Sequence, residues 1–447
     1  MPASPLDSAI YGALFSDEQT AALFSDTAEV RAMLEVEAAL ARVQGRLGVI
    51  PSAAGAEISE ALKTAAIDPG ALAAGTAGAG VPVPALLALL RRAVGGEAAQ
   101  YLHWGATSQD VLDTALVLRL RDALEIFEQR LVALAARLAE LSAAHRATLM
   151  AGRTRSQQAT PTSFGLKLAG WLAPLLRHRR RLEELRPRVL AVQFGGAVGS
   201  LAALGEAGVE VMEGLAAELG LTAPVLPWHA QRDGLAELAG WLSLVTGSLG
   251  KIGQDVVLLA QSEVGELRAG AEEGGSSTMP QKANPVAGEA LVAIARMNAA
   301  LLSNSHQALI HEQERGGAAW QQEWLGLPQM AILTGAALRH AGAMAARLEV
   351  RPEVMRANLE ASNGLVLAEA ASFALAAHMP RPEAQALVKA TCREIAGTGR
   401  HLIDALREKS DAPLDWDALR DPANYLGVAD ALIDRVLHAA RAKPSAS

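Results

Sequence analysis

The stretch GSSTMPQKANP, from Gly275 to Pro285, lies between two segments with helical patterns and differs from both in composition. Glycines frame its start and two prolines lie within it, so its backbone is free at the beginning and restricted at the end, which predicts a loop. Its polar side chains are those of Ser276, Ser277, Lys282 and Asn284. Two hydroxyls, an ammonium and an amide can move a proton beside a carboxylate and stabilise the negative charge that results.

The segments on either side of this loop have the apolar spacing of long packed helices. Steps of four and three residues alternate from Leu124 to Leu141, and again from Leu235 to Leu259. This spacing, sustained over three turns or more, is typical of helix bundles. Further long helices are predicted over 173–192, 286–311 and 328–348. The sequence therefore predicts an all-α fold with a long central helix bundle.

Glycines interrupt the second run at Gly247, Gly250 and Gly253. Each lowers helix propensity by about 1 kcal/mol relative to alanine. Their expected use is to let neighbouring helices approach closely. Apolar helix faces that the chain itself leaves uncovered would need partner subunits.

The helical pattern changes twice along the chain, which predicts three helical domains. Residues 1–110 contain short helices, among them an amphipathic helix from Thr27 to Leu47. Residues 111–350 contain the long helices and the loop described above. The pattern breaks near Pro352, and residues 351–447 form a smaller helical unit.

Composition narrows the possible partners and the compartment. Of 447 residues, 51% are hydrophobic and only 4% aromatic, which favours closely packed helices over sheets. The net charge is −8 and basic residues cluster only briefly, at His178–Arg181, so we expect no nucleic-acid partner. The single cysteine, Cys392, excludes an intramolecular disulfide and suits a reducing cytoplasm. The longest uncharged run, Pro69–Leu90, is broken by prolines, so we expect no membrane span and no signal peptide.

The sequence also lacks the usual patterns for a bound cofactor or metal. No GxGxxG follows a strand pattern, and no GxxxxGK[ST] is present. No His, Asp and Glu cluster has the spacing of metal ligands. We therefore expect chemistry without a cofactor and without a metal.

GSSxMPxKxNP is the signature of the fumarase/aspartase superfamily, and the stretch at 275–285 resembles it at every fixed position. The resemblance implies three all-helical domains, a homotetramer whose central helices form a common bundle, and active sites that each draw on three subunits. It implies that Ser276 is the catalytic serine and that Ser277 lies beside it at the substrate. Lys282 and Asn284 would hold the carboxylate whose α-carbon gains or loses a proton.

A first additional motif region is HWGATSQD, from His103 to Asp110. Its Thr107 and Ser108 match the paired hydroxyls with which the superfamily grips substrate carboxylates. The alternative is structural, because Thr or Ser shortly before an acidic residue is also a common helix start.

The other region is AGRTRSQQATP, from Ala151 to Pro161. Thr154 and Gln157 match substrate-contacting positions of the superfamily. Arg155 stands where its lyases usually have a histidine, and an arginine cannot act as an acid or base near neutral pH. A cation here suits a substrate with several carboxylates. The alternative is a structural ion pair, for example with Glu289.

The missing histidine and four further segments resemble the bacterial 3-carboxy-cis,cis-muconate cycloisomerases, although that branch usually has a large aromatic residue at position 155. The segments are QFGGAVGSLAALG at 193–205, PWHAQRD at 227–233, QERGGAAWQQEW at 313–324 and GLVLAEA at 364–370. Within them, Arg315 and Arg232 are candidate carboxylate ligands through bidentate geometry. His229 and His103 are further candidates, although a histidine beside a tryptophan is often structural.

These observations predict a cytoplasmic cycloisomerase, an intramolecular lyase of protocatechuate (β-ketoadipate) catabolism. It would convert the tricarboxylate 3-carboxy-cis,cis-muconate to 4-carboxymuconolactone. Three alternatives stay open at this point. They are an adenylosuccinate- or argininosuccinate-type lyase, which Arg155 argues against, a cycloisomerase acting on a sulfonated muconate, and a non-enzymatic structural role.

Overall fold

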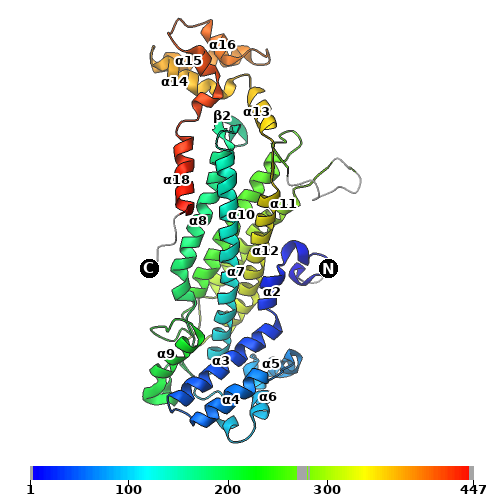
Figure 1. The fold of residues 1–447 in the computed structure, drawn as a ribbon, viewed down its shortest axis with the longest axis vertical. Helices are drawn as coiled ribbons and strands as arrows, with labels where there is room; N and C mark the ends of the chain where they lie inside the picture. Colours follow the sequence, from blue (N-terminus) through cyan, green and yellow to red (C-terminus); the bar gives the residue numbers. More distant parts are fainter. Residues whose placement is uncertain (1–3, 269–278, 280–281, 442–447) are drawn as a thin grey trace. The chain divides into compact units, whose positions relative to one another are not determined.

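The computed structural model describes residues 4–268, 279 and 282–441. Helices dominate this part of the chain, and its strands form two small antiparallel pairs (Figure 1). The prediction of an all-α fold is therefore confirmed. Contacts divide the chain into two compact units. The first unit is Met1–Arg130, His178–Gly247 and Ala293–Arg339, and the second unit is Leu131–Arg177, Ser248–Val292 and His340–Ser447. The division into three domains stays a prediction.

The longest helices contribute residues to both units. They are α7 (Ser108–Ala144), α8 (Phe164–Val189), α10 (Asp233–Leu259), α11 (Val286–Gln307) and α12 (Ala318–Arg347). The sequence predicted each of them, but it placed the start of α8 at 173 instead of Phe164 and the start of α12 at 328 instead of Ala318, nine and ten residues too late. Pro174 lies inside α8 and Pro328 inside α12. A proline usually begins or breaks a helix, so packing has overridden the local preference here.

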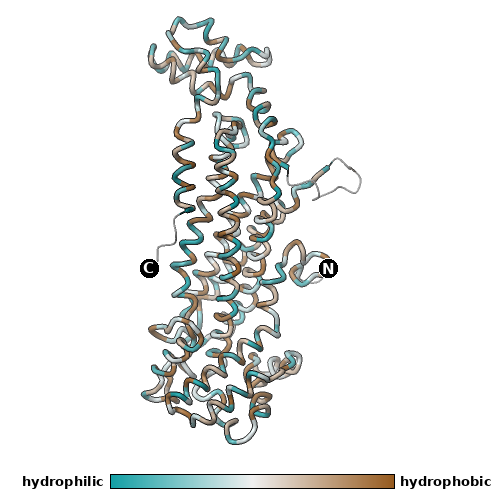
Figure 2. Tube along the Cα trace, in the orientation of Figure 1, coloured by the Kyte–Doolittle hydropathy of each residue, from teal (hydrophilic) through white to brown (hydrophobic). Residues whose placement is uncertain are grey.

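The two runs with alternating steps of four and three form the buried faces of α7 and α10. Each apolar residue of these runs is at most 7% exposed, as in the fully buried Leu131, Leu238 and Val256. Figure 2 shows apolar and polar residues alternating along the same helices. The predicted bundle spacing therefore corresponds to real core positions.

The first unit completes its core with short helices. They are η1 (Pro5–Asp7), α1 (Gly12–Phe15), α2 (Glu18–Leu23), α3 (Asp26–Arg46), α4 (Ser52–Thr64), η2 (Pro69–Leu72), α5 (Ala73–Ala79), α6 (Val83–Val94), η3 (Ala98–Tyr101), η4 (Ala202–Ala207) and α9 (Gly208–Leu219). The α3 helix starts where the Ser25 hydroxyl accepts a hydrogen bond from the Ala28 amide, with acidic residues in its first turn. Its apolar face, including Met33 and Leu40, is buried where α3 packs on α4 and α9.

The second unit contains the strands and the C-terminal helices. Its elements are β1 (Leu149–Thr154), β2 (Gln157–Ser163), β3 (Leu267–Arg268), β4 (Glu349–Val350), α13 (Pro352–Glu360), η5 (Leu365–Leu367), α14 (Ala368–Ala376), α15 (Arg381–Ile395), α16 (Leu402–Arg407), α17 (Trp416–Arg420), η6 (Pro422–Tyr425) and α18 (Ala429–Arg441). The β1–β2 hairpin packs against α13, η5 and η6. The sequence did not predict this hairpin, which carries the Thr154–Gln157 region.

Two of the long helices, α10 and α11, could cross a membrane by length and composition alone. Both have buried core faces, however, with Leu238 on α10 and Leu291 on α11 completely inaccessible to solvent. A core helix of a bundle passes the same test of length and composition as a spanning helix. Packing within the chain buries 50% of the apolar window of α10 and 33% of that of α11.

The glycines of α10 differ in their surroundings. A Cβ on Gly253 would lie 2.6 Å from the carbonyl oxygen of Gly288 and 2.9 Å from the Cβ of Leu291, both on α11. The predicted close approach of helices is therefore confirmed at Gly253. A Cβ on Gly247 would meet no described atom within 4 Å, so this glycine makes no such approach within the chain. The prediction for Gly250 is not tested.

We predict opposite effects for alanine at these two positions. Gly253→Ala should lower the urea midpoint of unfolding, because overpacking costs about 1–3 kcal/mol and outweighs the gain of about 1 kcal/mol in helix propensity. Gly247→Ala, the matched control on the same helix, should gain the propensity term alone. The midpoints are measured by circular dichroism. A Gly253→Ala protein at least as stable as Gly247→Ala would show that the helices do not depend on this contact.

Candidate active site

Thr107 and Arg315, two of the predicted substrate contacts, meet in the first unit. The α7 helix begins at Ser108, and the backbone N–H of Thr107 donates to Oδ2 of Asp110 at 3.0 Å, which is the reciprocal half of a capping box. The hydroxyl of Thr107 accepts a hydrogen bond from Nη1 of Arg315. The backbone of Thr107 thus has the helix-start role given above as the structural alternative. Its hydroxyl lies beside the exposed guanidinium of Arg315. Ser108 is half-buried, and its hydroxyl has no hydrogen bond to another described residue.

The carboxylate of Asp110 organises the segments around this turn. It is 1% exposed. Besides the Thr107 amide, Oδ1 accepts from the Gly195 amide at 2.9 Å and Oδ2 from the Gly196 amide at 2.9 Å. The side-chain amide of Gln193 donates to Oδ1 at 3.1 Å, and Nε2 of His229 lies 2.8 Å from the same oxygen. One side chain therefore fixes the helix start and the segments 193–196 and 227–233.

Glycine is required where these segments approach one another. A Cβ on Gly195 would lie 2.7 Å from Pro227 and 2.8 Å from the ring of His229. Gly105, just before the Thr107 turn, has φ +74, and a Cβ there would lie 2.7 Å from the side chain of Leu204. These close contacts explain why the QFGG sequence has glycine at 195 and the HWG sequence has glycine at 105.

Arg232 is held in a buried ion-pair network. It is 2% exposed, and its guanidinium donates to both oxygens of Asp113, at 2.6 and 3.1 Å, and to both oxygens of Glu323. Burial acts to lower the pKa of the guanidinium, but the two carboxylates outweigh it and raise the pKa. Trp320 also donates to Asp113, at 2.9 Å. Since two carboxylates surround one cation, the network would repel a substrate carboxylate. The structure thus gives Arg232 a structural role, and its substrate contact stays a prediction.

The two candidate histidines are also engaged with carboxylates. His229 is 3% exposed and lies against Asp110. Nδ1 of His103 lies 2.5 Å from Oε1 of Glu37, whose side chain is 1% exposed. Burial acts to lower the pKa of His103, but the charge and hydrogen bond of Glu37, together with the charge of Asp110, raise it above its ordinary value. His103 therefore ties the turn before Thr107 to Glu37 on α3.

The second region forms the tip of the β1–β2 hairpin in the second unit. Arg155 and Ser156 occupy the turn with φ of +49° and +63°, the left-handed angles of a two-residue hairpin turn. Thr154, Arg155 and Gln157 are exposed. Among the described residues, Arg155 makes no ion pair, so the structural pair proposed with Glu289 does not form within the chain. Left-handed non-glycine residues cost free energy and concentrate at functional sites.

The residue before this tip is anchored firmly. Arg153 donates to both oxygens of Glu266, at 2.9 and 2.6 Å, and the side-chain amide of Asn358 donates to the same carboxylate at 2.9 Å. Glu266 is fully buried. The hairpin thus presents Arg155 from a rigid base, next to β3, the strand that precedes the 275–285 stretch.

The third region is only partly described. Ser276 and Ser277 lie outside the described residues, so their predicted roles stay predictions. Lys282 is exposed, and its backbone N–H donates to the carbonyl of Met279 at 3.0 Å. Asn284 is half-buried, directly before α11, and its carbonyl accepts from the Val286 amide at 2.9 Å. The Lys282 ammonium and the Asn284 amide make no side-chain hydrogen bond or ion pair with another described residue, so both are available to a ligand.

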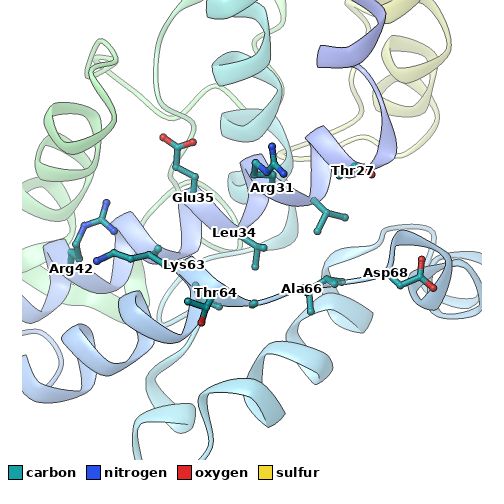
Figure 3. Close-up of a pocket in the computed structure, with 14 residues that line it drawn as sticks. Thr27, Arg31, Leu34, Glu35, Arg42, Lys63, Thr64, Ala66 and Asp68 are labelled. Atoms are coloured by element: carbon teal, nitrogen blue, oxygen red, sulfur yellow. The ribbon is translucent and has the colours of Figure 1, made fainter.

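A cavity of about 730 Å³ lies elsewhere in the first unit, between α3 and the segment after α4. Leu34, Lys63 and Ala66 are among the residues that line it (Figure 3). None of the predicted site residues does. The described site residues therefore lie apart from this cavity.

The residues that hold the site together were not among those predicted from the sequence. Asp113, Glu323 and Glu37 are buried carboxylates, and each binds a side chain or segment that carries a predicted contact. One signal was available. Asp110 and Asp113 are three residues apart, so both lie on one face of the first turns of α7.

We predict a pH dependence of stability from the His103–Glu37 pair. The pKa of His103 is raised in the folded protein, so its contribution is complete below the unfolded pKa, about 6.5, and is lost as the pH rises through the higher folded value. The difference in urea midpoint between the natural protein and His103→Gln should be largest at pH 5.5 and shrink toward pH 9. A difference that stays constant over this range would contradict the assignment.

Comparison with known proteins identifies the family of this chain. A family model described as "Lyase" matches residues 14–297, and one described as "Adenylosuccinate lyase C-terminus" matches residues 364–436. The 3-carboxy-cis,cis-muconate cycloisomerase of Pseudomonas aeruginosa is 47% identical over 438 residues, covering 96% of this chain and 95% of that protein. The protein of the same name from Acinetobacter baylyi is 39% identical, covering 97% and 99%.

A solved structure agrees with these relatives in fold. The crystal structure of 3-carboxy-cis,cis-muconate lactonizing enzyme from Pseudomonas putida matches with a TM-score of 0.91 and 43% identity, over 97% of this chain and 99% of that one. The chain therefore belongs to the lyase family of the fumarase/aspartase superfamily, which its 275–285 stretch resembles.

Proposed function

We propose that the chain is a cycloisomerase that converts 3-carboxy-cis,cis-muconate to 4-carboxymuconolactone, without a cofactor or metal. The observation that carries this proposal is the relation to proteins of that name, at 47% and 39% identity over nearly the whole chain. The arginine at position 155 argues against the alternative of a lyase that eliminates fumarate, because such lyases of the superfamily usually use a histidine there.

The reaction needs one group to carry a proton and others to stabilise an anion. A substrate carboxylate adds to a double bond conjugated with a second carboxylate, and negative charge builds on that second group. The α-carbon beside it is then protonated. In this proposal Ser276 carries the proton, and Lys282 and Asn284 stabilise the developing charge.

The remaining carboxylates of the substrate need cations and donors. Arg155 and Arg315 are exposed and have no carboxylate partner among the described residues, unlike Arg232. Guanidinium groups bind carboxylates in paired, charge-assisted hydrogen bonds. We assign both arginines to substrate binding, together with the neutral donors Thr107, Ser108, Thr154, Gln157 and Ser277.

The proposed assembly is a cytoplasmic homotetramer with active sites shared between subunits. Support comes from apolar side chains on the long helices that the chain leaves exposed: Leu244 and Leu258 on α10, Met297 on α11 and Leu325 on α12, each 44–68% accessible. Burying them would add about 25 cal/mol per Å² of apolar surface. A common bundle of central helices would cover these faces.

Direct assay tests the proposed reaction. Purified protein should consume 3-carboxy-cis,cis-muconate, with loss of the ultraviolet absorbance of its conjugated diene, and the rate should be unchanged by a chelator. A sulfonated muconate, adenylosuccinate and argininosuccinate serve as competing substrates. Faster turnover of any of these, or no turnover of a muconate, would contradict the proposal.

For Ser276→Ala we predict a fall in kcat of about 10²–10⁴, because the proton carrier is lost. Thermal unfolding should match that of the natural protein, which shows that the fold is intact. Retention of the natural kcat would remove Ser276 from the mechanism.

For Arg155→Met we predict a KM raised about 10- to 100-fold, since a hydrogen bond to a charged group contributes about 1.5–3 kcal/mol. Arg180→Met is the matched control, because the Arg180 side chain is 80% exposed and, among the described residues, pairs only with Glu184 on the surface of α8. An Arg155→Met protein with the KM of the control would instead favour a structural role for Arg155.

A further inference from the structure

The loop between α11 and α12, residues 308–317, carries Arg315 and holds a fully buried histidine. The side chain of His311 is 0% exposed. Neither ring nitrogen has a hydrogen-bond partner among the described residues. Leaving a buried polar group unsatisfied destabilises a fold, whereas an apolar group of the same shape would not. The unsatisfied ring of His311 therefore lowers the stability of the fold, and packing alone does not explain why a histidine is present there.

A possible partner for His311 lies just out of reach. Its Nε2 is 3.8 Å from Oε1 of Glu323, beyond the range of a hydrogen bond. Oε1 already accepts from Nε of Arg232 at 2.8 Å, and a carboxylate oxygen has a second lone pair. A shift of about 1 Å would bring the pair to normal hydrogen-bond length.

The same loop links His311 mechanically to Arg315. A Cβ on Gly316 would lie 2.7 Å from the carboxylate of Glu312, 3.1 Å from its backbone nitrogen and 3.3 Å from Cα of His311. The backbone beside Arg315 therefore packs directly on the backbone that carries the histidine. Gln313, between them, has φ +52, a second locally strained feature. A shift of the backbone at Gly316 toward Glu312 would therefore also displace the backbone of His311.

We infer that His311 is a positioning residue for Arg315. In the structure Arg315 donates to the Thr107 hydroxyl, and neither ring nitrogen of His311 has a hydrogen-bond partner among the described residues. When a substrate carboxylate binds Arg315, the loop shifts and Nε2 of His311 donates to Glu323. This new hydrogen bond holds the loop, and with it the guanidinium of Arg315, in the binding position. This inference rests on the proposed function, because the substrate carboxylate drives the shift.

Three substitutions of His311 separate this role from simple packing. His311→Phe keeps an aromatic ring but removes both nitrogens, so KM should rise about tenfold, as expected for the loss of a hydrogen bond to a charged group, while kcat changes little. His311→Gln places an amide nitrogen near the position of Nε2 and should restore most of the KM. His311→Asn reaches only the position of Nδ1 and should behave like His311→Phe in KM.

A double substitution tests the link to Arg315. In an Arg315→Met background, His311→Phe should raise KM no further, because coupled residues are not additive. Additive effects on KM would overturn the inference, as would an unchanged KM in both His311→Phe and His311→Asn. An equal KM increase in His311→Gln would also overturn it, since the donor position would then not matter. Absence of muconate turnover by the natural protein would instead refute the proposed function.

Discussion

The buried carboxylate of Asp110 is the constraint on which the first part of the site depends. Burying a carboxylate costs several kcal/mol unless donors replace its water, and here five donors from three separate segments do so. Their convergence on one acceptor gives the Thr107 turn a fixed position relative to the glycines at 195–196 and to His229.

One turn further along α7, the carboxylate of Asp113 is also buried, but its partners include the charged guanidinium of Arg232. It binds Arg232 and Trp320, and Arg232 in turn binds Glu323 on α12. The three candidate arginines thus divide into two kinds. Arg232 is buried and has satisfied partners, so it joins helices, whereas Arg155 and Arg315 are exposed without a carboxylate and are left for a ligand. His311 lies 3.8 Å from Glu323, a partner of Arg232, and it shares the 308–317 loop with Arg315.

Periodicity and the 275–285 stretch were enough to predict the helical class, the long helices and the superfamily. The starts of α8 and α12 were not predictable, because Pro174 and Pro328 are tolerated inside helices by tertiary packing. The β1–β2 hairpin was missed because its turn residues, Arg155 and Ser156, are not the glycine and asparagine that usually signal left-handed angles. Local sequence also could not show which of two similar arginines is buried, since the partners of Arg232 lie about 90 and 120 residues away.

Hydrogen exchange at the amides of Gly195 and Gly196 tests most directly whether Asp110 holds the site together. Asp110→Asn replaces one acceptor oxygen by a donor that faces these N–H groups. If the carboxylate holds the segments, both amides should lose protection in the variant, together with kcat/KM for the muconate, while amides in the α3 helix stay protected. Unchanged protection at both glycines in Asp110→Asn would contradict this account.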